Sequence, residues 1–178
     1  MPATPTLDRR IPLVLLALGV QAAILAWDHF HGGVASHHLL ANRALPAVSS
    51  WWGLLLTPIL AWWAVAGVQR RAVRATAASR VGPLAGFLCA LAYGGVLALL
   101  FSRGSALVEY LFFGLLALAL VVRLWHGEYL LGFVSGMMFV TGPILPAMFG
   151  AVIALFSWLA HTVARAVWRR LRARRGLT

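Results

Sequence analysis

Long apolar runs separated by short polar stretches set the pattern of this 178-residue chain. Six such runs follow one another, and most approach the roughly 20 residues that a helix needs to cross a bilayer. We therefore predict an all-α fold: a polytopic integral membrane protein with six transmembrane helices in a single domain. The predicted spans cover residues 11–27, 51–68, 83–102, 105–125, 128–141 and 147–168.

Residues at the ends of these runs support the boundaries. Ser50 is a natural N-cap for the second span, and Trp51 and Trp52 suit the membrane interface. Pro83 opens the third span in a first turn, where its missing N–H costs nothing. Two prolines and a glycine in the turn over 142–146 are predicted to break the chain between the fifth and sixth spans.

The first run has two interpretations. It follows the charged residues Asp8, Arg9 and Arg10, and a signal peptide also combines a charged start with an apolar run. Small residues over 33–35 would then form the cleavage site. We expect instead that the first helix is retained as a span.

Small residues within the spans predict close helix packing. Gly132 and Gly136 stand four residues apart in the fifth predicted span, with Ser135 beside them, and this spacing lets two helix backbones approach each other. The single cysteine, Cys89, lies within the third span and is expected to be a small packing residue.

Composition supports the bilayer as solvent and argues against nucleic acid as partner. The chain is 62% hydrophobic and only 11% charged, which is more apolar surface than a soluble domain of this size can bury. Its net charge of +11 comes from 15 arginines and no lysine. Most of these arginines lie at the ends of apolar runs, where they serve membrane orientation and contact anionic headgroups.

The arginines also predict the orientation. Thirteen of the 15 fall on one side of the six-span arrangement, and only Arg43 and Arg103 fall on the other. Because arginine gathers on the cytoplasmic side, we predict both termini inside, a basic cytoplasmic tail over 169–178 and an outer loop over 28–50. The Ala, Arg and Leu bias is typical of a high-GC bacterium, so the predicted location is the bacterial inner (cytoplasmic) membrane.

The outer loop collects residues that bind metals. Asp28, His31, His37 and His38 fall within eleven positions directly after the first span. One carboxylate and two or three imidazoles form the usual ligand set of catalytic zinc, with an open position for water. We predict a divalent metal site, with zinc as the first candidate, at Asp28, His31, His37 and His38.

The geometry expected for this site requires the loop to fold back. If the first helix continues one turn past Trp27, Asp28 and His31 share a face at positions i and i+3. Glycines 32–33 permit a reversal, and Ser36 is expected to cap a short amphipathic helix over 37–42.

Glu109 is the further candidate for catalysis. By our count it lies about one turn inside the fourth span on the outer side, where a carboxylate is costly unless it faces a polar partner or cavity. We therefore name Glu109 and Asp28 as catalytic candidates. The competing explanation is interfacial packing, because histidines are common in the exposed loops of membrane proteins.

A second polar cluster is predicted on the cytoplasmic side, from Arg123, His126, Glu128 and His161. Two histidines could act as axial haem ligands, or His161 could relay protons to Glu128. We favour ion pairs and helix-end contacts, because one of the histidines lies in a short connection.

Two classes of function follow. The first is a metal-dependent membrane enzyme, a hydrolase acting on a lipid or membrane-associated substrate at the extracytoplasmic face. The alternative is a non-enzymatic membrane protein, either a small-solute transporter or an assembly subunit of a larger membrane complex. The expected partner is a bilayer with anionic headgroups; a homo-oligomer or larger complex is left open.

Overall fold

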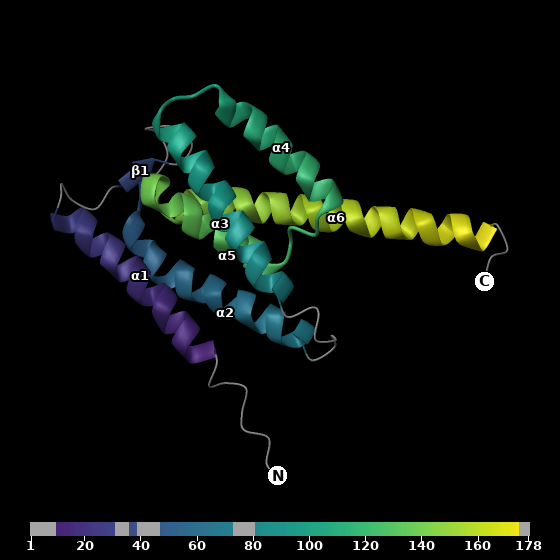
Figure 1. The fold of residues 1–178 in the computed structure, drawn as a ribbon, viewed down its shortest axis with the longest axis horizontal. Coiled ribbons are helices and arrows are strands. Elements are labelled where there is room, and N and C mark those ends of the chain that lie inside the picture. Colours follow the sequence, from purple (N-terminus) through teal and green to yellow (C-terminus); the bar gives the residue numbers. More distant parts are fainter. Residues whose placement is uncertain (1–9, 31–35, 39–46, 73–80, 175–178) are drawn as a thin grey trace, which may run out of the picture.

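The computed structural model describes residues 10–30, 36–38, 47–72 and 81–174. Six α-helices dominate this part of the chain, as predicted, and they run alternately in opposite directions (Figure 1). The helices are α1 (Arg10–Phe30), α2 (Gly53–Ala72), α3 (Val81–Ser102), α4 (Leu107–Val121), α5 (Gly127–Thr141) and α6 (Ile144–Arg174). Two short strands, β1 (Ser36–His38) and β2 (Ala47–Ser49), and the 3-10 turn η3 (Ser50–Trp52) join α1 to α2.

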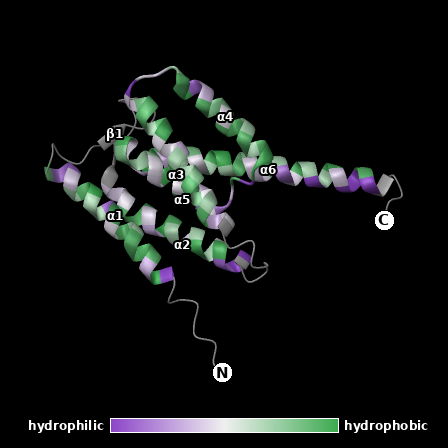
Figure 2. Ribbon diagram, viewed as in Figure 1, coloured by the Kyte–Doolittle hydropathy of each residue, from purple (hydrophilic) through white to green (hydrophobic). Residues whose placement is uncertain are grey.

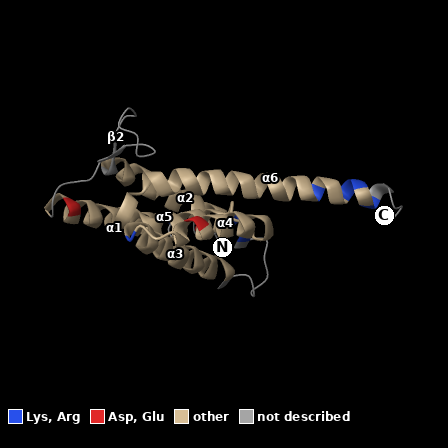
Figure 3. Cartoon of the chain, turned by 90° about the horizontal axis from the view of Figure 1, so that it is seen from above, with Lys and Arg blue, Asp and Glu red and all other residues tan. Residues whose placement is uncertain are grey.

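The bundle has two ends that differ in their residues. We call one the hairpin end: α1 ends there, β1 pairs with β2, and α2 begins. The opposite end holds Arg10 at the start of α1, Arg70 and Arg71 at the end of α2, and Arg123 after α4. We call it the arginine end. The last part of α6 extends beyond the other helices and is rich in arginine (Figures 1 and 3).

Three helices are long and apolar enough to cross a membrane: α1, α3 and α6 within residues 10–30, 82–102 and 144–172. Helix α4 is apolar but shorter. Apolar side chains are exposed along these helices, among them Leu16, Phe113 and Val152, and hydrophilic residues gather mainly at helix ends and on the last part of α6 (Figure 2). These features indicate a membrane protein, because such a surface is stable in lipid and not in water.

Helix α5 lies at the centre of the bundle, packed most extensively against α3 and also against α2 and α6. A Cβ atom added to Gly94 of α3 would come within 2.5 Å of the Phe133 carbonyl oxygen, and one added to Gly132 or Gly136 would collide with the α3 backbone. The close approach predicted from the glycine spacing is therefore confirmed, and the partner helix is α3.

A buried polar contact joins α1 to α2. The Thr57 hydroxyl donates to the Gln21 side-chain oxygen at 3.1 Å, and both residues are almost completely buried. Gly53 begins α2 against this pair, because a Cβ there would lie 2.7 Å from the Gln21 amide nitrogen and 2.5 Å from Pro143. The turn between α5 and α6 is thereby packed against α1 and α2.

The fourth helix ends earlier than the predicted residue 125. It stops at Val121, because the buried hydroxyl of Ser157 on α6 binds backbone groups of its last turn and of the residues that follow. Ser157 Oγ lies 2.7 Å from the Ala119 carbonyl and 3.1 Å from that of Val122, and it accepts from the Leu124 N–H at 3.2 Å. A serine on another helix thus satisfies the groups that a longer α4 would have paired internally.

The sixth helix is longer than predicted at both ends. Its start at Ile144 places Pro146 in the first turn, where the missing N–H is not needed, so the break is confined to Gly142 and Pro143. Gly142 has a φ of 70°, a left-handed conformation that favours glycine. At the other end, the helix runs through the basic segment as far as Arg174, six residues past the predicted 168.

The predicted helix over 37–42 is wrong where the structure describes it. His37 and His38 lie in β1, where they pair with Val48 and Ala47 of β2 in antiparallel register. Backbone pairing between the two arms of the loop replaces the local helical bonds that Ser36 was expected to initiate. Residues 39–42 lie outside the described part of the chain.

Candidate functional site

The first helix continues to Phe30, so Asp28 stands on its last turn, as the metal-site prediction required. Asp28 is partly buried, and no arginine or histidine among the described residues forms an ion pair with it. His29 beside it is exposed and packs edge-to-face on Phe30, with 5.5 Å between ring centroids.

The three predicted histidine ligands are described incompletely. His31 lies outside the described residues, and for His37 and His38 the structure gives the backbone of β1. Among the described residues there is no group of three or more His, Cys, Asp or Glu side chains that could hold a metal ion. The metal site therefore stays a prediction.

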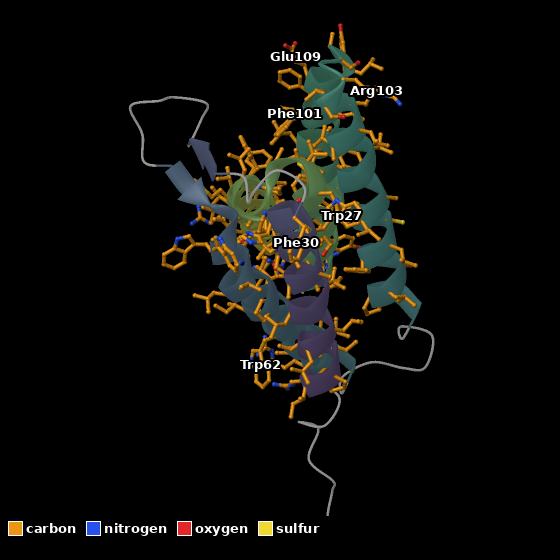
Figure 4. All side chains as sticks on the ribbon, turned by 90° about the vertical axis from the view of Figure 1, so that its left-hand side faces the viewer. Trp27, Phe30, Trp62, Phe101, Arg103 and Glu109 are labelled. Atoms are coloured by element: carbon orange, nitrogen blue, oxygen red, sulfur yellow. The ribbon has the colours of Figure 1, made fainter. Side chains whose placement is uncertain are left out.

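Glu109 lies in the first turn of α4 and is exposed. Figure 4 shows it at the same end of α3 and α4 as Arg103 of the turn between them, and away from Trp27 and Phe30 on α1. Because α4 begins at Leu107, Glu109 is at the helix N-terminus, where a carboxylate is stabilised by the helix dipole. Its catalytic role stays a prediction.

An apolar groove of about 730 Å³ lies between α2 and α6 and begins at the hairpin end. Trp52, three positions after the end of β2, lines its start, and Leu55 and Ile59 continue it along α2. Ile144 and Met148 line it from α6. The groove therefore begins close in the chain to the histidine-bearing hairpin and continues along the bundle.

At the arginine end, a polar cluster links α2, α5 and the connection before α5. The Arg71 guanidinium donates to the Glu128 carboxylate at 2.5 Å, and the Glu128 side chain is only 9% exposed. Arg71 also donates to the Gly67 carbonyl at 3.2 Å, which fixes the guanidinium on α2. This ion pair holds the end of α2 to the start of α5.

His126 lies beside this pair, with its Nδ1 atom 3.9 Å from a Glu128 oxygen. Burial lowers the pKa of His126 below its usual value, and the nearby Arg71 lowers it further, while Glu128 raises it and Arg123 lowers it. The net direction is downward, so the imidazole is neutral at pH 7 and its contact with Glu128 is not an ion pair.

Trp125 packs against both histidines of the cluster. Its ring centroid lies 5.5 Å from that of His126 and 4.8 Å from that of His161, both edge-to-face. His161 Nδ1 lies 2.9 Å from the Ser157 carbonyl oxygen, to which it donates when it carries the proton. These contacts favour the predicted structural explanation, ion pairs and helix-end contacts, for His126, Glu128 and His161, although the ion pair of Glu128 is with Arg71; Arg123 forms no ion pair with a described carboxylate.

Sequence reasoning missed several partners. Arg71 was recognised only as part of a basic loop, and the Gln21–Thr57 and Ser157 contacts were not predicted. One signal was available for Arg71: the chain has only four acidic residues, and Glu128 was placed at the same end as the arginines after the second span. No family model, curated protein or solved structure matches the chain.

Proposed function

We propose that the protein is a polytopic membrane enzyme: a metal-dependent hydrolase acting on a lipid or membrane-associated substrate at the outer face of the bacterial inner membrane. The observation that carries the proposal is that three features lie at the hairpin end. These are the carboxylate of Asp28, which forms no ion pair with a described arginine or histidine, the strand with His37 and His38, and the apolar groove that begins at Trp52.

Chain connectivity keeps the proposed ligands near one another. Phe30 and Ser36 are six residues apart, so the connection that contains His31 spans at most about 22 Å. At its other side, β2 continues directly into η3 and α2, so the paired strands stay at the head of α2. Helices α1 and α2 pack along each other and limit the movement of both ends.

The donor types fit a divalent metal. A carboxylate and three imidazoles, from Asp28, His31, His37 and His38, match the nitrogen and oxygen ligands of zinc. A zinc ion bound there would lower the pKa of its water to about 7 and supply hydroxide as the attacking group. Glu109 would have to act through water or after a movement of the α3–α4 turn, because it lies away from the end of α1 (Figure 4).

The groove supports a membrane-derived substrate. The residues that line it are apolar, so it suits an acyl or other hydrocarbon chain and offers no specific polar contacts. A substrate chain in the groove would place its polar group near Trp52 and the hairpin. In this proposal all six helices cross the bilayer, and the arginine end faces the cytoplasm.

Metal content tests the proposal. The protein is purified through a tag without histidine, exposed to zinc, dialysed, and analysed by elemental mass spectrometry. We expect about one zinc per chain, and loss of most of it in Asp28→Asn and in the double variant His37→Ala/His38→Ala. His29→Ala is the matched control, because His29 is a neighbouring histidine outside the ligand set. A wild-type protein without bound metal would contradict the proposal.

The same groove supports the alternative, a non-enzymatic assembly subunit. Ten apolar residues of α2, η3, α5 and α6 line the groove, which could receive a helix of another membrane protein. A metal-free protein that copurifies with a defined membrane partner would favour this second function, and so would retention of that partner by Asp28→Asn.

A further inference from the structure

A second cavity, of about 450 Å³, opens between α3 and α4 on another side of the bundle. It exists because α4 leaves α3 and packs on α6 instead, where Ser157 holds its end. The floor of the cavity is formed by α5, with Tyr129 and Phe133. Its volume falls within the range of roughly 300–1,000 Å³ that is typical of small-molecule sites.

Small residues form one wall of this cavity. Gly82, Ala85, Gly86 and Cys89 line it from α3, and the wall continues to Tyr93. The opposite wall, on α4, includes Leu118. The small side chains of α3 leave the cavity open on the side that would face the bilayer. An acyl chain that enters the cavity gains van der Waals contacts with its walls.

The length of the cavity corresponds to one leaflet. From Gly82 to Tyr93 it follows eleven residues of α3, or about 16 Å at a rise of 1.5 Å per residue. Half of a hydrocarbon core of about 30 Å is about 15 Å. Because Gly82 is in the first turn of α3, the cavity runs from the arginine end to the middle of the bundle.

Arg123 lies at the arginine end of the cavity, between two residues that line it. Val122 and Leu124 line the cavity at the arginine end, and Arg123 between them is exposed. Of the four acidic residues of the chain, Asp8 lies outside the described residues and Glu128 is engaged by Arg71; no described carboxylate forms an ion pair with Arg123. Asp28 and Glu109 belong to the hairpin end. A lipid phosphate is therefore the complementary anion for Arg123.

We propose that this cavity binds an anionic phospholipid of the arginine-end leaflet, with one acyl chain between α3 and α4 and the phosphate at Arg123. The site is separate from the groove between α2 and α6 and does not depend on the hydrolase activity. Binding stabilises the position of α4, which otherwise contacts α3 only slightly.

The experiment measures lipid retention. The protein is placed in nanodiscs of equal parts phosphatidylglycerol and phosphatidylcholine with identical acyl chains, extracted in mild detergent, and examined by native mass spectrometry. We expect one retained lipid per chain, with phosphatidylglycerol preferred. Arg123→Gln should reduce that preference about five-fold, the effect of one arginine near a phosphate surface. Arg103→Gln, at the other end of the bundle, should leave it unchanged.

The acyl-chain part has its own variants. Cys89→Phe fills the cavity and should abolish retention of both lipids, whereas Ala92→Phe adds the same ring at an exposed α3 position outside the cavity and should retain them. If Cys89→Phe does not fold, Leu118→Phe on the opposite wall takes its place. Equal retention by the filled variant and wild type would overturn the proposal, as would an unchanged preference in Arg123→Gln.

Discussion

The ion pair between Arg71 and Glu128 allows a prediction in which the two partners are not equivalent. The Glu128 side chain is 9% exposed and the Arg71 side chain 35% exposed. Removing Arg71 leaves a carboxylate in a buried position, whereas removing the carboxylate leaves a guanidinium that can turn toward water and headgroups. The cost should therefore depend on which partner is lost.

The magnitude follows from the two limits for such pairs. Breaking a buried pair by removing one partner costs about 3–5 kcal/mol, and an exposed pair contributes about 0–1 kcal/mol. Arg71→Met should therefore destabilise the protein by about 3 kcal/mol, near the buried limit, and Glu128→Gln by about 1 kcal/mol. The double variant should cost less than the two single effects together, because it leaves no unpaired buried charge.

The assay is unfolding in mixed micelles of sodium dodecyl sulfate and dodecyl maltoside, followed by tryptophan fluorescence. Arg70→Met is the matched control, since Arg70 is exposed on the adjacent position of α2, and it should change stability by less than about 0.5 kcal/mol. Equal costs for Arg71→Met and Glu128→Gln, or strict additivity in the double variant, would refute this account of the ion pair.

Three further predictions follow from named contacts. Gly94→Ala should destabilise the protein by about 1–3 kcal/mol, because the new methyl group meets the Phe133 carbonyl. Gly19→Ala, with open space around it, should stabilise the protein by about 0.5–1 kcal/mol. Unfolding in micelles measures both changes, and a Gly94→Ala variant as stable as wild type would contradict the close packing. Because the pKa of His126 is lowered in the folded protein, its contribution to the free energy of unfolding should be fully present above the usual histidine pKa and decline as the pH falls below it. Thermal unfolding measured over a pH series should show a smaller decline in His126→Gln than in wild type. The same pH dependence in both proteins would contradict this prediction. In a Cys89→Ala background, His29→Cys at the hairpin end should react with an impermeant maleimide in intact cells and Ala173→Cys in the basic tail should not; the reverse pattern would invert the orientation.

Much of the fold could be predicted because the hydrophobic pattern is local. The uniform apolar runs located the six helices within a few residues, and Gly132 and Gly136 indicated a close helix contact. The predicted helix lengths were less accurate, because helix ends depend on contacts with residues far away in the sequence. Helix α4 ends at Val121 because Ser157 of α6 binds its last carbonyls, and the sequence around 121 does not contain that serine. Three helices meet the criteria of length and apolarity for a span, so six crossings remain part of the proposal.

The candidate site was less predictable for a related reason. Side-chain types indicated metal ligands, but where the structure describes the loop, β1 pairs with β2 in place of the expected helix over 37–42, and this pairing depends on residues 9 to 13 positions apart. Glu109 was judged by an assumed depth, and a helix start only two residues later moved it to the exposed first turn. The Arg71–Glu128 pair joins residues 57 positions apart, so only the predicted topology could have suggested it.

The most direct test of the central claim is zinc K-edge X-ray absorption of the purified, zinc-loaded protein. The account predicts a four-coordinate site with nitrogen and oxygen ligands at about 2.0–2.1 Å and the outer-shell scattering of two or three imidazoles. The same spectrum from Asp28→Asn should show an altered first shell, and that from His29→Ala should match the wild type. A wild-type protein that holds no zinc after dialysis, or a shell of oxygen atoms without imidazole scattering, would contradict a metal-dependent enzyme at the hairpin end.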